Sequence, residues 1–181
     1  MNSACLYLWS LLSIVVQLHN QADIARESLT AAEKEVGRIF TAAGIGIVWL
    51  ECPSEATCAQ PCSPSQFDLR IAAGVRTGDE KTTVGVARSS GAGAGYVTVF
   101  YPRIVEFAKQ GTATQQQILG HVIAHEIGHQ LLGSKPHAGF GIMRGQWDAR
   151  DLRAAAMGAL LFSPSEAALM RSAVGRQSGC H

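Results

Sequence analysis

Three histidines and one glutamate lie within the nineteen-residue stretch HEIGHQLLGSKPHAGFGIM, at positions 125–143. On a helix, His125 and His129 are about one turn apart, so both imidazoles project from one face and can reach a single ion. Glu126 lies at the edge of that face, where a carboxylate can accept a proton from a metal-activated water without being a ligand. These residue types at this spacing predict a zinc site with hydrolytic chemistry.

The residues around this pair of histidines have the pattern of an amphipathic helix. Apolar residues repeat every four positions on the side opposite the histidines, so we expect one face to pack and the other to face a cleft. Gly133 is a natural end for the helix, because glycine adopts the left-handed conformation without a steric penalty. The apolar repeat consists of Leu119, Ile123, Ile127 and Leu131.

A third ligand is expected from outside this helix. His137 follows the link Ser134-Lys135-Pro136, which disfavours helix and lets the chain turn back. Three protein ligands would leave the fourth tetrahedral position to water, as in catalytic zinc sites. His121 lies one turn before His125, but three successive helix turns cannot all converge on one small ion, so we expect it to pack or to support a ligand.

The whole stretch resembles the signature of the metzincin zinc endopeptidases, HExxHxxGxxH followed by a methionine-bearing turn beneath the metal. Three residues rather than two separate His129 from Gly133, and three rather than two separate Gly133 from His137. The turn Gly141-Ile142-Met143 follows His137 by only six positions, which is short for that clan. The resemblance implies the metal ligands His125, His129 and His137, the general base Glu126, and Met143 in a structural Met-turn.

Glu166 is the rival third ligand, because gluzincin-type zinc peptidases take a glutamate from a later helix. Its surroundings favour a simpler role. Ser163-Pro164-Ser165-Glu166 places Ser at the N-cap, Pro at the first helical position and Glu at the third, which is the pattern of a capping box. We therefore expect Glu166 to cap the last helix.

The predicted function is that of a zinc metallopeptidase. The metzincin resemblance implies that it is an endopeptidase. Two alternatives remain open: a zinc hydrolase acting on a non-protein amide, and a non-catalytic zinc-binding protein. The intact Glu126 argues against the second alternative. Tyr96, Tyr101 and Arg144 are candidates for stabilising an oxyanion, and Trp147 is expected to pack the lower part of the domain rather than contact substrate.

Composition favours one compact enzyme domain. Of the 181 residues 47% are hydrophobic, and the formal net charge is +1. Dispersed Lys and Arg provide no electrostatic footprint for nucleic acid or an anionic membrane. Residues 4–18 are apolar but have no preceding Lys or Arg and are too short for a membrane span. We expect a partial export segment at 1–12, no stable membrane insertion, and a monomer acting on a peptide or protein substrate.

Three of the five cysteines, Cys52, Cys58 and Cys62, cluster in a loop that contains Pro and Ser. One disulfide within this loop is feasible in an oxidising compartment. A cysteine zinc knuckle is the competing interpretation, but the loop has no CxxC pair and no fourth ligand nearby. Cys5 and Cys180 remain unassigned. The pattern favours a secreted or periplasmic protein.

The elements that must position the site predict an α+β fold whose N-terminal half is α/β-like. We expect strands at 13–18, 46–50, 67–71, 84–87 and 95–101, and helices at 22–43, around the histidines, and after Ser163. This order resembles the twisted mixed sheet, with a backing helix, that metzincin N-terminal halves lay over the active-site helix. One catalytic domain then covers 13–181, with an N-terminal half at 13–133 and a small, mostly helical half at 134–181. A strand at 84–87 or 95–101 is the candidate edge for pairing with an extended peptide.

Overall fold

The computed structural model describes residues 12–53, 58, 65–75, 84–89, 95–133 and 137–176. They form one mixed five-stranded sheet with the strand order β2-β1-β3-β5-β4. The first four strands in that order run parallel, and β4 is antiparallel to β5. The predicted α+β class with a mixed sheet is confirmed. The strands are β1 Ser13–Asn20, β2 Gly46–Glu51, β3 Gln66–Ala72, β4 Gly85–Ser89 and β5 Gly95–Phe100.

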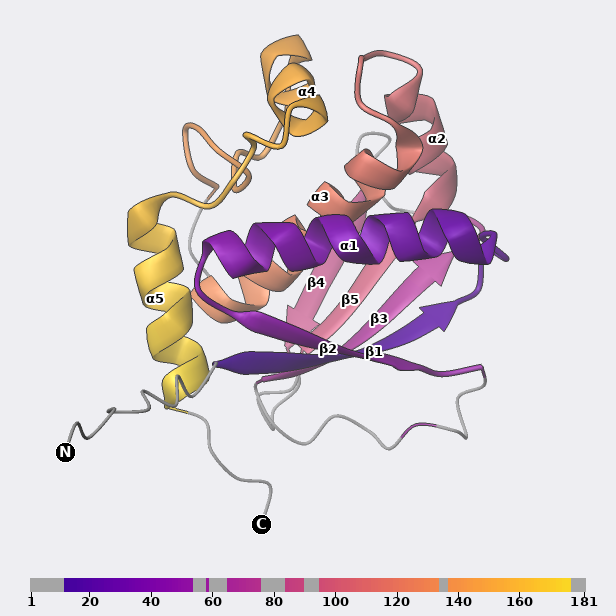
Figure 1. Cartoon of the computed structure of the whole chain (residues 1–181). Coiled ribbons are helices and arrows are strands. Elements are labelled where there is room, and N and C mark those ends of the chain that lie inside the picture. Colours follow the sequence, from indigo (N-terminus) through magenta and orange to yellow (C-terminus); the bar gives the residue numbers. More distant parts are fainter. Residues whose placement is uncertain are drawn as a thin grey trace, which may run out of the picture.

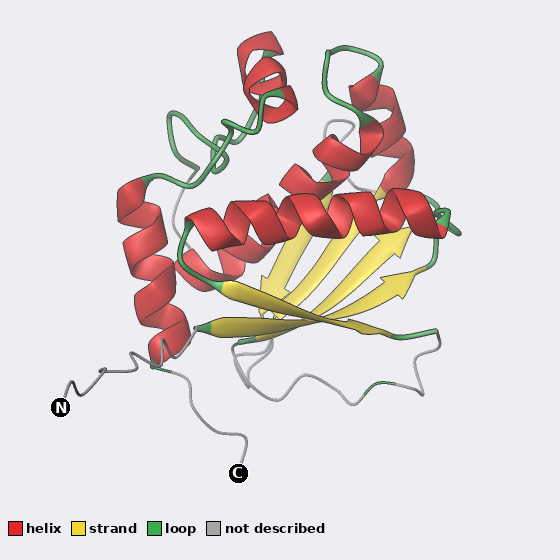
Figure 2. Cartoon of the chain, in the orientation of Figure 1, coloured by secondary structure: helices red, strands yellow, loops and turns green. Residues whose placement is uncertain are grey.

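The helices gather on one face of this sheet (Figures 1 and 2). α1 packs against β2 and α3, and α3 in turn packs against the strands β4 and β5. α5 packs against α3, which therefore has neighbours along most of its surface. The helices are α1 Arg26–Ala42, α2 Tyr101–Ala108, α3 Gln115–Leu132, α4 Ala149–Ala156 and α5 Pro164–Gly175.

The sheet follows from alternation in the strands. In β1, Ile14, Val16 and Leu18 are at most 2% exposed and point into the core with the helices. β3 contributes Phe67, Leu69 and Ile71 to the same core in the same way. The first helix begins at Arg26 rather than at 22, and its chain leaves through Gly44 at a φ of +77°, a conformation that glycine adopts without strain.

Two short helices were not predicted. Tyr101 was assigned to the end of a strand but begins α2, and Pro102 in its first turn is a helix-start signal that the strand interpretation passed over. α4 follows the N-cap residue Asp148, whose side chain accepts from the backbone N–H groups of Arg150 and Asp151. Both helices span eight residues. In so short a window, apolar periodicity does not separate helix from strand.

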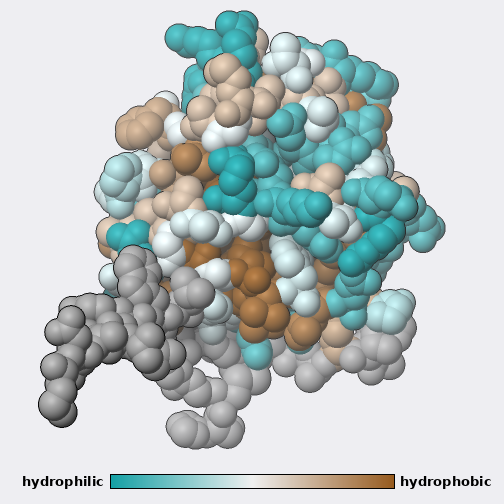
Figure 3. Space-filling model, in the orientation of Figure 1, coloured by the Kyte–Doolittle hydropathy of each residue, from teal (hydrophilic) through white to brown (hydrophobic). Residues whose placement is uncertain are grey.

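The predicted disulfide joins Cys52 at the end of β2 to Cys58. Some of the predicted features lie outside the described residues. These are Cys5, Cys62 and Cys180, residues 1–11 of the predicted export segment, and most of the glycine run at 89–95. Within the described part, no helix combines the length and apolar character needed to cross a membrane. Apolar side chains also reach the surface on β2, where Val48 and Leu50 are 48% and 44% exposed. Figure 3 shows a brown, hydrophobic area on this side of the molecule.

Candidate metal centre

The helix α3 carries two of the three histidines and the glutamate. It begins at a capping box in which Thr114 Oγ1 accepts from the backbone N–H of Gln117, and the Gln117 side chain accepts from the backbone N–H of Thr114. It ends before Gly133, whose φ is +73°. Local sequence signals thus determine both ends of the helix.

The packing of α3 differs from the expected division into one packed and one open face. Every residue from 118 to 128 is buried, including His121, His125 and Glu126. The reason is that α1, α2, α5 and the strands β4 and β5 all pack against this helix. The ionisable side chains that the sequence assigned to a cleft face are therefore largely removed from water.

The structure brings His125, His129 and His137 together around one point. Nε2 of His129 lies 3.0 Å from Nε2 of His125 and 3.1 Å from Nε2 of His137. The three ligand atoms all lie within 4.8 Å of one another. Zinc–nitrogen bonds of about 2.0–2.1 Å in a tetrahedron place two nitrogen ligands about 3.3 Å apart. The three histidines are therefore close enough to bind one metal ion.

The ring of His125 is fixed in the form that a metal requires. Its Nδ1 lies 2.7 Å from the carbonyl oxygen of Ile142. Because a carbonyl oxygen only accepts, Nδ1 carries the hydrogen and Nε2 offers its lone pair. Burial lowers the pKa of His125 to about 4 and also lowers the pKa of His129, which keeps both imidazoles neutral at neutral pH.

His137 reaches the site from a compact turn in the segment 137–148. The backbone N–H of Ala138 donates to the carbonyl of Met143 at 2.9 Å, which closes the turn. Ile142 N–H donates to the carbonyl of Leu161 at 3.1 Å, which ties the turn to the chain that precedes α5. Met143 is 3% exposed and packs against α3, where a Cβ added at Gly128 would lie 2.7 Å from its Sδ. The Gly-Ile-Met turn thus supplies both packing and the carbonyl that orients His125.

Glu126 lies beside the three clustered histidines but is not a member of that cluster. Glu126 is 6% exposed, and burial raises the pKa of its carboxyl to about 7. A Cβ added at Gly85 of β4 would lie 2.8 Å from its Cγ and Oε1, so the strand approaches this side chain as closely as glycine allows. Glu126, His129 and His137 line one cavity of about 600 Å³. A carboxyl with a pKa near neutrality in this position suits proton transfer.

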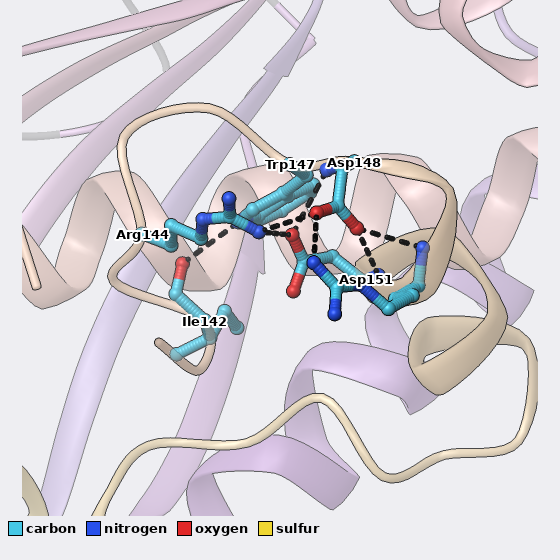
Figure 4. A network of polar contacts seen from close by, with 6 residues as sticks. Ile142, Arg144, Trp147, Asp148 and Asp151 are labelled. Carbon is cyan, nitrogen blue, oxygen red and sulfur yellow. Dashed lines mark hydrogen bonds and ion pairs between the residues drawn. The ribbon is translucent and has the colours of Figure 1, made fainter. Parts of the chain in front are cut away.

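A second cavity, of about 370 Å³, is lined by His125 and in part by Trp147 and Arg144. Trp147 Nε1 donates to the Ile142 carbonyl at 3.1 Å, the same oxygen that His125 contacts (Figure 4). Its indole also makes an edge contact with the His125 ring. Trp147 was expected only to pack the lower part of the domain. A tryptophan four residues after the methionine gave no sequence signal for this contact, since it depends on the tertiary fold.

The remaining candidates have structural roles. Glu166 Oε2 accepts from the backbone N–H of Ser163 at 2.7 Å, so it caps α5 as expected. His121 is fully buried, with Nδ1 2.7 Å from the carbonyl oxygen of Gln117. Tyr101 donates its hydroxyl to Gln115 at 3.2 Å, and Tyr96 does not line either of these cavities within the described chain.

The chain matches no known protein family model, and no curated protein is similar to it in sequence.

Proposed function

We propose that this protein is a zinc-dependent peptidase that hydrolyses peptide bonds. The observation that carries the proposal is the convergence of three imidazole nitrogens beside a carboxyl group that is not needed as a ligand. Three nitrogen ligands with an open fourth position are the set used by catalytic zinc, whereas structural zinc is bound by four protein ligands. His125, His129 and His137 would hold the ion through Nε2.

The residues of this chain divide the chemistry between them. The three histidines would hold a zinc ion, which would supply a Lewis acid for the scissile carbonyl and lower the pKa of water towards 7. Glu126 accepts the proton of the attacking water and delivers it to the leaving amine. Burial raises the pKa of this carboxyl, which favours its holding the proton between these two steps.

An extended peptide fits the edge of the sheet beside this chemistry. β4 is the edge strand, and its residues Gly85, Val86 and Ala87 line the cavity that contains Glu126. The outer side of β4 has no strand partner among the described residues. A substrate backbone can therefore add to β4 as a further strand, which favours an endopeptidase acting on peptides or proteins.

The metzincin resemblance supports the same assignment, with Met143 as its Met-turn residue, although the spacings around Gly133 are longer than in the signature. The disulfide between Cys52 and Cys58 supports an oxidising location. We therefore place the peptidase outside the cytoplasm, secreted or in a periplasm.

The decisive experiment combines metal analysis with cleavage of a peptide library. Wild type should contain about one zinc per chain and cleave peptides. Glu126→Gln should keep the zinc and lose cleavage by more than about 100-fold, because general acid–base catalysis contributes about 10²–10⁴-fold. Glu106→Gln is the matched control, since its side chain is 63% exposed on α2 and pairs with Lys109.

The possible outcomes separate the three functions that the sequence left open. Zinc without peptide cleavage, but with hydrolysis of small acylated amines that Glu126→Gln abolishes, would replace the peptidase by a hydrolase of non-protein amides. Zinc with neither activity would identify a non-catalytic zinc-binding protein. Wild-type protein that binds no zinc would contradict the proposal as a whole.

A further inference from the structure

The cavity beside His125 has an unusual electrostatic composition. Two guanidinium groups, Arg103 from α2 and Arg144 from the segment after the Met-turn, contribute to its lining. Among the residues that the structure describes, no aspartate or glutamate lines it. Its remaining wall includes the apolar side chains of Val84, Val122, Phe107 and Trp147. The cavity therefore combines an apolar wall with positive charge.

The two arginines are not equally available to a ligand. Arg144 Nη1 donates to Asp148 at 2.9 Å and to Asp151 at 2.6 Å, as Figure 4 shows. The two carboxylates balance the positive charge of Arg144, and their hydrogen bonds raise its pKa further. Asp148 and Asp151 approach Arg144 from α4 and are not part of the cavity wall. The charge of Arg144 is satisfied within the protein.

Arg103 makes no ion pair with a carboxylate of the described residues. Its Nε is buried and has no hydrogen-bond acceptor within the part of the chain that the structure describes. A buried donor without an acceptor is unfavourable, more so when it belongs to a charged group. The planar guanidinium matches the geometry of a carboxylate, because it can donate two parallel hydrogen bonds to the two carboxylate oxygens. Because Nε itself is closed to solvent, a ligand carboxylate in this cavity would pair with the terminal nitrogens of the Arg103 guanidinium and supply the counter-ion that it lacks among the described residues.

We propose that the cavity beside His125 binds a carboxylate of the substrate, with Arg103 as its counter-ion. This inference rests on the proposed function, since His125 is at once a metal ligand and part of the cavity wall. A substrate residue that enters the cavity is thereby placed next to the scissile bond. The apolar wall accommodates the methylene stem of the side chain, which favours glutamate over aspartate.

A substrate carboxylate has two possible sources, an acidic side chain or the free C-terminus of a peptide. The two demand different test peptides. One pair of internally quenched peptides, with amidated ends, differs only in Glu against Gln at each position that flanks the cleaved bond. A second pair carries only neutral side chains and differs in a free against an amidated C-terminus one residue beyond that bond.

The expected result with wild type is a preference for one carboxylate-bearing member of these pairs of about 10-fold to 100-fold in kcat/KM. That range corresponds to a charged hydrogen bond of about 1.5–3 kcal/mol. Arg103→Gln should reduce the preference to less than about threefold, mainly through loss of activity on the carboxylate peptide, and leave cleavage of the neutral peptide within a factor of about two. Arg176→Gln, the same change at an exposed arginine at the end of α5, should leave the preference unchanged.

Binding measured without turnover keeps this inference distinct from the proposed function. The same peptides are titrated by calorimetry into zinc-loaded wild type and Arg103→Gln, whose melting temperature and zinc content are first shown to match. An Arg103-dependent preference in binding, without cleavage, would retain the carboxylate site and contradict the peptidase. Cleavage or binding with no carboxylate preference, or a preference that Arg103→Gln keeps, would overturn the carboxylate site and leave the peptidase in place.

Discussion

Two parts of the metal centre hold their histidines by different means. α3 presents His125 and His129 from a helix whose ends are set by local signals and whose residues from 118 to 128 are all buried. The segment 137–148 presents His137 from a turn that is closed by a few backbone hydrogen bonds, and His137 itself is exposed. The helix therefore provides rigid ligands, whereas the turn provides a ligand whose position depends on tertiary contacts.

The difference has a physical basis in burial. A buried helix loses packing when any of its side chains is shortened, because the surrounding groups relax only partly. An exposed side chain on a turn contributes little to stability, because it remains solvated in the folded and unfolded states. Metal binding needs both parts, whereas metal-free stability should depend mainly on the helix. Measuring metal affinity and metal-free stability on the same variants should therefore distinguish the two parts.

The largest expected effect comes from removing ligands one at a time. His125→Ala and His137→Ala should each weaken zinc affinity by more than about 100-fold, beyond the 10-fold to 100-fold typical of outer contacts to a ligand. In the metal-free protein, His125→Ala should lower the free energy of unfolding by roughly 2–4 kcal/mol, while His137→Ala should change it by less than about 0.5 kcal/mol. Competition with a chelating dye measures the affinity, and denaturant unfolding with excess chelator measures the stability.

Equal stability losses in the two variants would show that the turn is as important to the fold as the helix. Unchanged zinc affinity in His137→Ala would remove it from the ligand set. Gln116→Ala, at a partly buried α3 position outside the ligand cluster, is the control for the effect of shortening a side chain on this helix.

The second effect concerns the proton on the buried Glu126 carboxyl. Because its pKa is raised from 4.5 to about 7, the metal-free folded chain keeps a proton between these pH values that the unfolded chain has lost. The contribution of Glu126 to stability must therefore fall as pH rises from 4.5 to 7, by up to about 3 kcal/mol. Glu126→Gln has no such proton, so its stability relative to wild type should increase over that range.

Chelated wild type and Glu126→Gln, unfolded by denaturant at several pH values, provide the measurement. The lowered pKa of His125 acts in the opposite direction, because the unfolded chain binds the extra proton between pH 4 and 6.5. That contribution is common to both proteins and cancels in their difference. A difference that is independent of pH would show that the helix face carrying Glu126 is hydrated, and it would weaken the contrast between the two parts.

The same contrast explains how much of the site could be predicted from the sequence. Helix α3 was predictable because its apolar repeat, its histidine spacing and Gly133 are all local. The convergence of His137 was predicted only through its place in a motif, and the contacts of Trp147 and Arg103 were missed. Arg103 lies on α2, which was not recognised as a helix, and Trp147 meets His125 only because the turn returns to α3. Contacts between distant segments leave no periodic pattern in the chain.

The smallest expected effect tests how the turn positions its ligand. A Cβ added at Gly145 would lie 2.8 Å from Cγ and 2.9 Å from Nδ1 of His137, closer than a side chain normally permits. Gly145→Ala should therefore displace the exposed ring and weaken zinc affinity by about tenfold, the lower end of the range for an outer contact. Gly139→Ala, in the same turn but with no atom within 4 Å of its added Cβ, should bind zinc like wild type. Both affinities are measured by chelator competition. If Gly145→Ala also binds zinc like wild type, the turn moves freely enough to absorb the added methyl, and His137 is held by the metal rather than by the protein.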